Sequence, residues 1–118
     1  MKLTANKTNK MGKIEGFDKK KAVELSIELW EWLAKTGEMK DNWPEWNRYS
    51  EVESDCFLCE YSIRGCSKCP YYKKFGFCDD LDKPYDNWTF VWETRDLKKY
   101  AKQFLEQLKT ILKEMGEK

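Results

Sequence analysis

Apolar side chains recur at helical spacing near the start of the chain. The positions that lie three or four residues apart are Val23, Ile27, Trp30 and Ala34. Residues with this spacing share one face of a helix. Asp18 can cap the first turn, and Gly37 can end the helix because glycine tolerates the left-handed conformation. The pattern predicts a helix within residues 17–37.

A second, longer pattern occupies the end of the chain. Its apolar positions are Leu97, Ala101, Phe104, Leu108, Ile111 and Met115. The spacing alternates between four and three residues, as in a helix that packs lengthwise on another helix. It predicts a helix over residues 94–116. Two amphipathic helices of similar length suggest an antiparallel pair, and their wide apolar faces imply that the pair also covers other parts of the chain.

Residues 41–92, between the two helical patterns, have a different chemistry. They contain five aliphatic side chains of the Val, Ile and Leu type against thirteen aromatic ones. A core that is poor in aliphatic residues needs aromatic packing and an additional staple, for which small modules commonly use a metal. Residues 1–16 are rich in lysine and poor in apolar residues, so we expect a flexible basic arm there and a single domain over 17–118.

All five cysteines fall within the middle region, in two C-x2-C pairs followed by a fifth thiol. They are Cys56, Cys59, Cys66, Cys69 and Cys78. A C-x2-C pair suits tetrahedral zinc because the two intervening residues form a tight turn that can place both thiolates on one ion. The spacing predicts one structural zinc ion bound by four of the five cysteines. The predicted fold is therefore mostly α, with two long amphipathic terminal helices packed around an inserted zinc-stapled, aromatic-rich module.

The spacing leaves the choice of four ligands open. The symmetric set contains both C-x2-C pairs, but the six-residue connection between them is short, and Cys78 in place of Cys66 would give a wider loop with less strain. An iron–sulfur cluster is the alternative metal, since the Cys69-Pro70 sequence also occurs in ferredoxins, although those proteins space their cysteines more tightly. Disulfides are disfavoured because the N-terminal segment has no secretory signal, which predicts a reducing, cytoplasmic location.

Charge and composition argue against several classes of function. The net charge is +1, from 22 basic and 21 acidic residues, without the basic excess that is usual in nucleic-acid-binding domains. The chain contains no histidine, which excludes the histidine-dependent nucleophilic and acid–base mechanisms. A zinc ion with four sulfur ligands has no open position for substrate. We therefore expect no enzyme, and the lack of a long apolar run predicts no membrane span.

Several short segments together resemble a known group of proteins. They are ELSIELWEWLAKTG, WPEW, DCFLCEY, CSKCP, a later Cys, and KKYAKQFLEQL. This arrangement, over about residues 20–112, resembles small cysteine-rich proteins of uncharacterised function that bacteriophages and prophages encode. The resemblance implies a phage or prophage setting, with the cytoplasm of the host cell as the location, and a bound metal. It transfers no catalytic or binding residue.

The sequence favours action through a protein partner. Six tryptophans and six tyrosines are many for 118 residues, and these residue types dominate the hot spots of protein interfaces. Core packing is the expected role of most of these rings, and the alternative takes one or two tryptophans, with Tyr71 and Tyr72, as exposed anchors for a partner. The predicted function is a non-enzymatic zinc-binding protein, with a phage factor that inhibits a host or defence protein as one form of it. The alternative is a nucleic-acid-binding accessory protein that uses the basic arm and a lysine row formed by Lys98, Lys102, Lys109 and Lys113.

Overall fold

The computed structural model describes residues 18–49, 56–62, 68–78, 80 and 83–116. In chain order the elements are the helix α1 (Lys19–Thr36), the 3-10 helices η3 (Lys40–Asn42) and η4 (Pro44–Arg48), and the helices α2 (Phe57–Ser62), α3 (Pro70–Phe75), α4 (Pro84–Phe90) and α5 (Thr94–Gly116). These ranges contain no strand, so the prediction of a mostly helical protein is confirmed. The basic arm predicted for residues 1–16 lies outside the described ranges.

Local sequence determines both ends of α1. The Asp18 carboxylate accepts a hydrogen bond from the backbone N–H of Lys21 at 2.9 Å, which satisfies a donor that has no partner within the helix. At the other end Gly37 has φ of 73°, and its N–H donates to the Leu33 carbonyl at 2.9 Å. A Cβ atom at Gly37 would lie 2.5 Å from Cγ2 of Thr94. The end of α1 therefore touches the start of α5.

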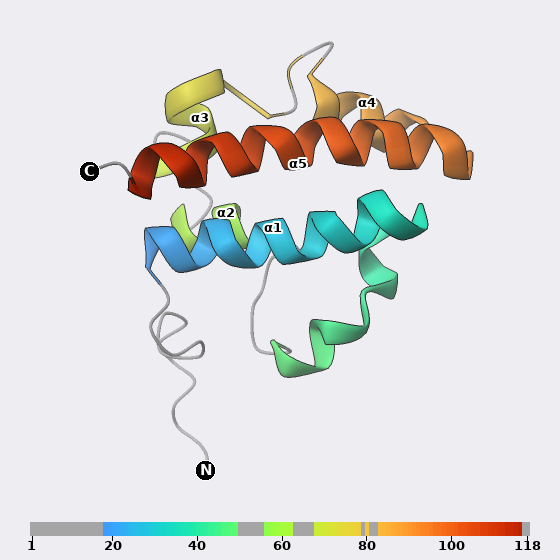
Figure 1. The fold of residues 1–118 in the computed structure, drawn as a ribbon, viewed down its shortest axis with the longest axis horizontal. Coiled ribbons are helices and arrows are strands. Elements are labelled where there is room, and N and C mark those ends of the chain that lie inside the picture. The colour runs from blue at the N-terminus through green and yellow to red at the C-terminus, as the bar shows by residue number, and fades with distance from the viewer. Residues whose placement is uncertain (1–17, 50–55, 63–67, 79, 81–82, 117–118) are drawn as a thin grey trace.

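The long helices α1 and α5 lie side by side and run in opposite directions, so the start of α1 and the end of α5 are at the same end of the molecule (Figure 1). Their contact is the most extensive between any two elements. The side chains buried along it include Leu25, Leu29, Leu33, Ala101, Phe104 and Leu108. Each fully buried leucine contributes roughly 1.5–3 kcal/mol, so this seam is the main apolar core.

The short helices of the middle region divide between the two long ones. α2 packs on α1, whereas α3 and α4 pack on α5. Figure 1 shows α3 above the C-terminal part of α5 and α4 above its N-terminal part. The residues expected to form one inserted module are therefore distributed over both long helices. This is possible because the apolar faces of α1 and α5 are wider than their mutual contact requires.

Aromatic rings fill much of the space between these elements. Trp30 of α1 packs edge-on against Phe104 of α5, with 4.6 Å between ring centroids, and against Trp88 of α4 at 5.0 Å. A second group consists of Trp43, Trp46, Tyr49 and Phe57. Edge-to-face and offset contacts of this kind stabilise a core beyond the area that they bury. Aromatic packing thus replaces the missing aliphatic residues, as the composition predicts.

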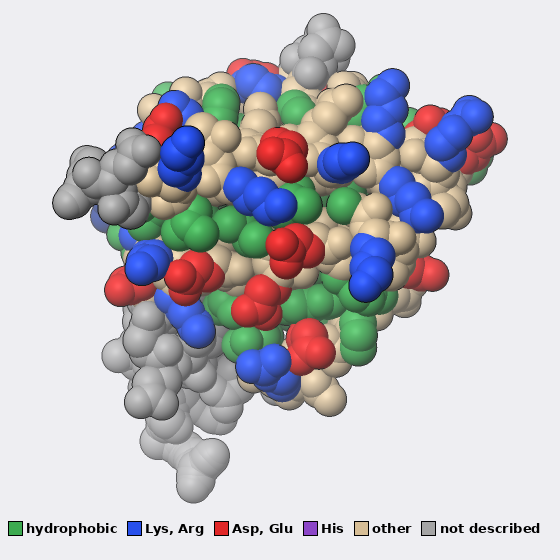
Figure 2. Space-filling view, viewed as in Figure 1, with side chains coloured by type: hydrophobic (Ala, Val, Ile, Leu, Met, Phe, Trp, Pro, Cys, Tyr) green, Lys and Arg blue, Asp and Glu red, His purple; other side chains and the backbone are tan. Residues whose placement is uncertain are grey.

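Charges of both signs are distributed over the surface. On the face drawn in Figure 2, acidic and basic side chains alternate around an apolar stripe, without a large patch of one sign. Among the described helices, none is both long and apolar enough to cross a bilayer.

Candidate metal centre

Four of the five cysteines lie within or directly beside the two short helices α2 and α3. Cys56 directly precedes α2 and Cys59 lies within its first turn. Cys69 directly precedes α3, and Cys78 lies in the turn that follows α3. The fifth, Cys66, lies outside the described residues. α2 packs on α1 and α3 packs on α5. A group that joined these four thiols would therefore connect a helix that packs on α1 with a helix that packs on α5.

The first pair is held by its own turn in a geometry that favours a thiolate. The backbone N–H of Cys59 donates to the Cys56 sulfur at 3.4 Å. A hydrogen bond from the Cys59 thiol is the main cause that lowers the pKa of Cys56 to about 6; nearby backbone N–H groups and the Lys40 ammonium lower it further, while burial opposes them. The pKa of Cys59 is raised, mainly because its thiol donates to Cys56. These hydrogen bonds therefore favour ionisation of Cys56 and oppose ionisation of Cys59.

The thiols of Cys69 and Cys78 also influence the Cys56–Cys59 pair. Besides the Cys56 hydrogen bond and burial, the charges of Cys69 and Cys78 also raise the pKa of Cys59. Burial raises the pKa of Tyr71 to about 12, and the charges of Cys78 and Cys69 contribute. Such interactions weaken with distance, so they indicate that Cys69 and Cys78 lie in the neighbourhood of the first pair. Cys66 lies outside the described residues, and the choice between Cys66 and Cys78 as the fourth ligand stays a prediction.

Lys40 is a component of this region that the sequence did not indicate. Its side chain is buried, with only 6% of the residue exposed, and its Nζ lies 3.3 Å from the Tyr85 hydroxyl and 4.9 Å from the centre of the Tyr85 ring. Its charge lowers the pKa of Cys56. No sequence signal could have identified it, because lysine is among the residue types that are mostly solvent-exposed.

The donor set fits a zinc tetrathiolate in its chemistry. It offers four sulfur atoms, a backbone N–H that already donates to one of them, and a buried cation nearby. As the side chains stand, no three Cys, Asp or Glu residues of the described ranges converge closely enough to hold an ion. No disulfide joins any two of the four described cysteines. Rearrangement of the thiols would be needed to reach zinc–sulfur distances of about 2.3 Å.

The alternative that takes Tyr71 as an exposed anchor is wrong, and the expectation of core packing holds for this residue. Tyr71 is 1% exposed, because its side of α3 faces α5. Its ring packs against Phe104 with 5.2 Å between centroids, and its hydroxyl donates to Oε1 of Gln107 at 2.6 Å. Tyr72 is half-buried and packs against Phe77 at 4.8 Å.

The two most exposed aromatic side chains lie instead at the end of α4 and just after it. Trp92 is 82% exposed and Phe90 is 70% exposed, while Val91 between them is half-buried. We call these three residues the aromatic corner. The tryptophan content of the sequence predicts exposed anchors in general, but not this location, which depends on the position where α4 ends.

Comparison with known proteins provides no indication of function. No protein-family model, curated protein or solved structure matches this sequence. Function is therefore inferred from the thiol cluster, the buried Lys40 and the exposed Trp92.

Proposed function

We propose that this protein is a non-enzymatic binding module that is stapled by one zinc ion and contacts a partner protein through the aromatic corner. The proposed zinc ligands are Cys56, Cys59, Cys69 and Cys78. Cys78 is taken as the fourth ligand because its charge, like that of Cys69, acts on Cys59. Four sulfur ligands close the coordination shell of zinc, which makes the ion structural. When bound, the ion neutralises the repulsion between the thiolates and links α2 to α3.

The charge of such a centre gives the buried Lys40 a role. Zinc with four thiolates carries a net charge of about −2, and a charge within a protein is costly unless another group compensates it. Lys40 supplies an opposite charge close to Cys56. The same lysine is held in place by the Tyr85 hydroxyl and ring. A buried ammonium beside a thiol cluster is easier to explain when all the thiols are deprotonated.

The exposure of Trp92 is the observation that carries the proposal of a protein partner. A tryptophan with 82% of its surface in water is unusual, and Phe90 extends the apolar surface at the same corner. Covering a tryptophan side chain contributes on the order of 4 kcal/mol before the entropic cost of association. Tryptophan is also among the residues most enriched at interface hot spots.

The charges around the corner favour a protein over a nucleic acid. Glu93 and Arg95 follow Trp92 and lie 3.9 Å apart at their nearest charged atoms, so neither sign dominates. The lysine row is exposed along α5, with the exposed Glu106 between Lys102 and Lys109. Binding driven by phosphates needs an unbalanced positive surface and weakens steeply with salt. An interface anchored by Trp92 should change little with salt.

The test is capture of a partner from a bacterial lysate by three forms of the protein. The resemblance to phage-encoded proteins selects this lysate, and we propose a host or defence protein, inhibited by occupation, as the target. Wild type and Trp92→Phe should retain the same stoichiometric protein at low and at moderate salt, because both present an aromatic ring. Trp92→Ala should lose it. Capture of DNA or RNA without a protein, or equal capture by Trp92→Ala, would overturn the proposal.

A further inference from the structure

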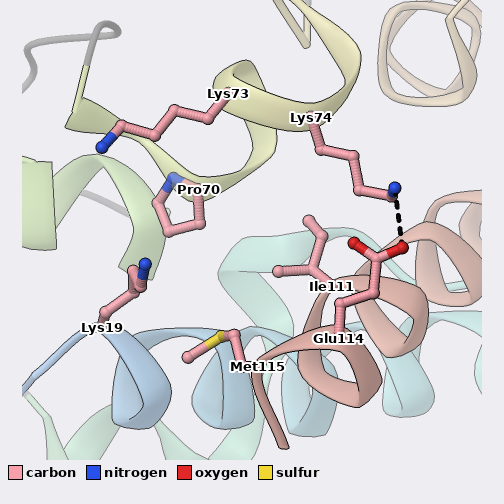
Figure 3. Close-up of a pocket in the computed structure, with 7 residues that line it drawn as sticks. All are labelled: Lys19, Pro70, Lys73, Lys74, Ile111, Glu114 and Met115. Atoms are coloured by element: carbon pink, nitrogen blue, oxygen red, sulfur yellow. Dashed lines mark ion pairs between the residues drawn. The ribbon is translucent and has the colours of Figure 1, made fainter. Parts of the chain in front are cut away.

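A pocket lies at the end of the molecule opposite to the aromatic corner. It has a volume of about 340 Å³ and is formed where the start of α1, the helix α3 and the end of α5 meet (Figure 3). The residues that line it are Lys19, Pro70, Lys73, Lys74, Ile111, Glu114 and Met115. Ligand pockets begin at about 300 Å³, so this one has room for one or two side chains but not for a large cofactor.

The pocket combines an apolar floor with an uneven distribution of charge. Pro70 and Ile111 are buried and Met115 is half-buried. Lys74 forms an ion pair with Glu114 at 2.8 Å. In Figure 3 the ammonium groups of Lys19 and Lys73 lie on the other side of the pocket. Among the described residues, no carboxylate lies within ion-pair distance of either one, so this side carries positive charge that an incoming anion could neutralise.

We propose that this pocket binds a peptide segment of another protein in which an acidic residue stands next to an aliphatic one. The acidic side chain would lie between Lys19 and Lys73, and the aliphatic side chain would cover Ile111 and Met115. Charge complementarity and the apolar floor each account for one half of this ligand. Amphipathic side-chain pairs of this kind fit a small groove that has one charged wall.

Other occupants fit the pocket less well. A polyphosphate or a nucleic acid would leave the apolar floor uncovered and would meet the Glu114 carboxylate at the rim. The chain's own first sixteen residues are rich in lysine and would be repelled by Lys19 and Lys73. The pocket is also a separate site from the aromatic corner, because Trp92 precedes α5 whereas Ile111 lies in its last third, and the 17 residues from Thr94 to Ile111 span about 26 Å.

Methionine-methyl NMR of the full chain tests the proposal at a single side chain. The probe is the peptide acetyl-Glu-Leu-Asp-Leu-amide, and its controls replace either the leucines by glycine or the acidic residues by lysine. The Met115 methyl signal should shift and saturate with the probe and respond to neither control. Met39, which lies beyond the other end of α1, serves as the internal reference and should not move. An unmoved Met115 signal, or an equal shift with the glycine peptide, would overturn the proposal.

Charge variants distinguish this pocket from general electrostatic attraction. Lys73→Glu should weaken binding of the probe at least about tenfold, because it replaces an attractive charge by a repulsive one. Lys109→Glu makes the same change at an exposed position of α5 that does not line the pocket, and should leave the affinity unchanged. Equal weakening by both variants would contradict the proposal, as would Met115 shifts that follow protein concentration without peptide. Trp92→Ala should bind the probe normally, so failure here is separable from failure at the aromatic corner.

Discussion

In the Cys56–Cys59 turn, Cys56 accepts hydrogen bonds and Cys59 donates them, which lowers the pKa of Cys56 and raises the pKa of Cys59. The backbone N–H of Cys59 points at the Cys56 sulfur, and the Cys59 thiol adds a second donor. Such donors stabilise a thiolate whether or not a metal is bound. C-x2-C spacing predicts this local arrangement. The spacing does not decide between Cys66 and Cys78 as the fourth ligand, because that choice depends on tertiary contacts rather than on the turn itself.

Single Cys→Ser variants should separate four positions from the fifth. We expect Cys56→Ser, Cys59→Ser, Cys69→Ser and Cys78→Ser to lose bound zinc and to unfold at lower temperature, because each removes one of four ligands. Cys66→Ser should keep both the metal and the melting temperature. Elemental analysis and thermal unfolding of each purified variant provide the measurements. Zinc that persists in Cys78→Ser but is lost from Cys66→Ser would show that the symmetric set is correct.

Lys40 should matter for retention of zinc rather than for helix content. Lys40→Met keeps the length of the side chain but removes the charge that offsets the thiolates, so we expect zinc to be lost about tenfold more readily to a competing chelator. Lys35→Met is the matched control, because Lys35 is an exposed lysine in the last turn of α1. Equal retention by the two variants would show that Lys40 has no electrostatic role at the metal.

At the scale of the elements, local rules account for the long helices better than for the short ones. Asp18 and Gly37 determine the ends of α1 through hydrogen bonds within their own turns, and the apolar period of α5 is unambiguous. The short helices α2 and α3 have no such pattern. Whether each packs on α1 or on α5 depends on tertiary contacts such as that between Tyr71 and Phe104. For this reason the sequence leaves open whether Tyr71 lies in the core or on the surface.

The contact between Gly37 and Thr94 gives a test of how the long helices meet. Gly37→Ala should lower the free energy of unfolding by roughly 2–4 kcal/mol, because alanine resists the positive φ and its Cβ would collide with Cγ2 of Thr94. Thr94→Ser removes that methyl group, so Gly37→Ala should cost about 1 kcal/mol less in a Thr94→Ser background. Urea unfolding of the four proteins measures both quantities. Strict additivity would indicate that the two residues are not in contact.

In the molecule as a whole, the four described cysteines belong to segments that pack on different long helices. α2 covers α1 and α3 covers α5, while the seam of α1 and α5 has its own apolar core. A zinc ion shared by α2 and α3 would therefore stabilise the packing of these two short helices more than the contact between α1 and α5. The aromatic corner and the lysine-walled pocket lie at opposite ends of this frame, which leaves both available at the same time.

Removal of zinc should therefore destabilise α2 and α3 more than α1 and α5. After treatment with a chelator, we expect the amide protons of α2 and α3 to exchange much faster, while those in the middle of α1 and α5 stay more protected, because the free energy of metal binding stabilises mainly the segments that supply the ligands. Hydrogen exchange followed by mass spectrometry resolves these segments. Exchange that increases equally throughout the chain, or nowhere, would contradict this division.

The metal content of the purified chain decides whether a zinc ion staples this fold. The protein should be isolated without added metal and examined by native mass spectrometry and elemental analysis, together with its visible absorption spectrum. We expect one zinc ion per chain, bound with loss of thiol protons, and no visible absorption. A chain without metal would contradict the zinc staple, and iron with visible absorption would show an iron–sulfur cluster in its place.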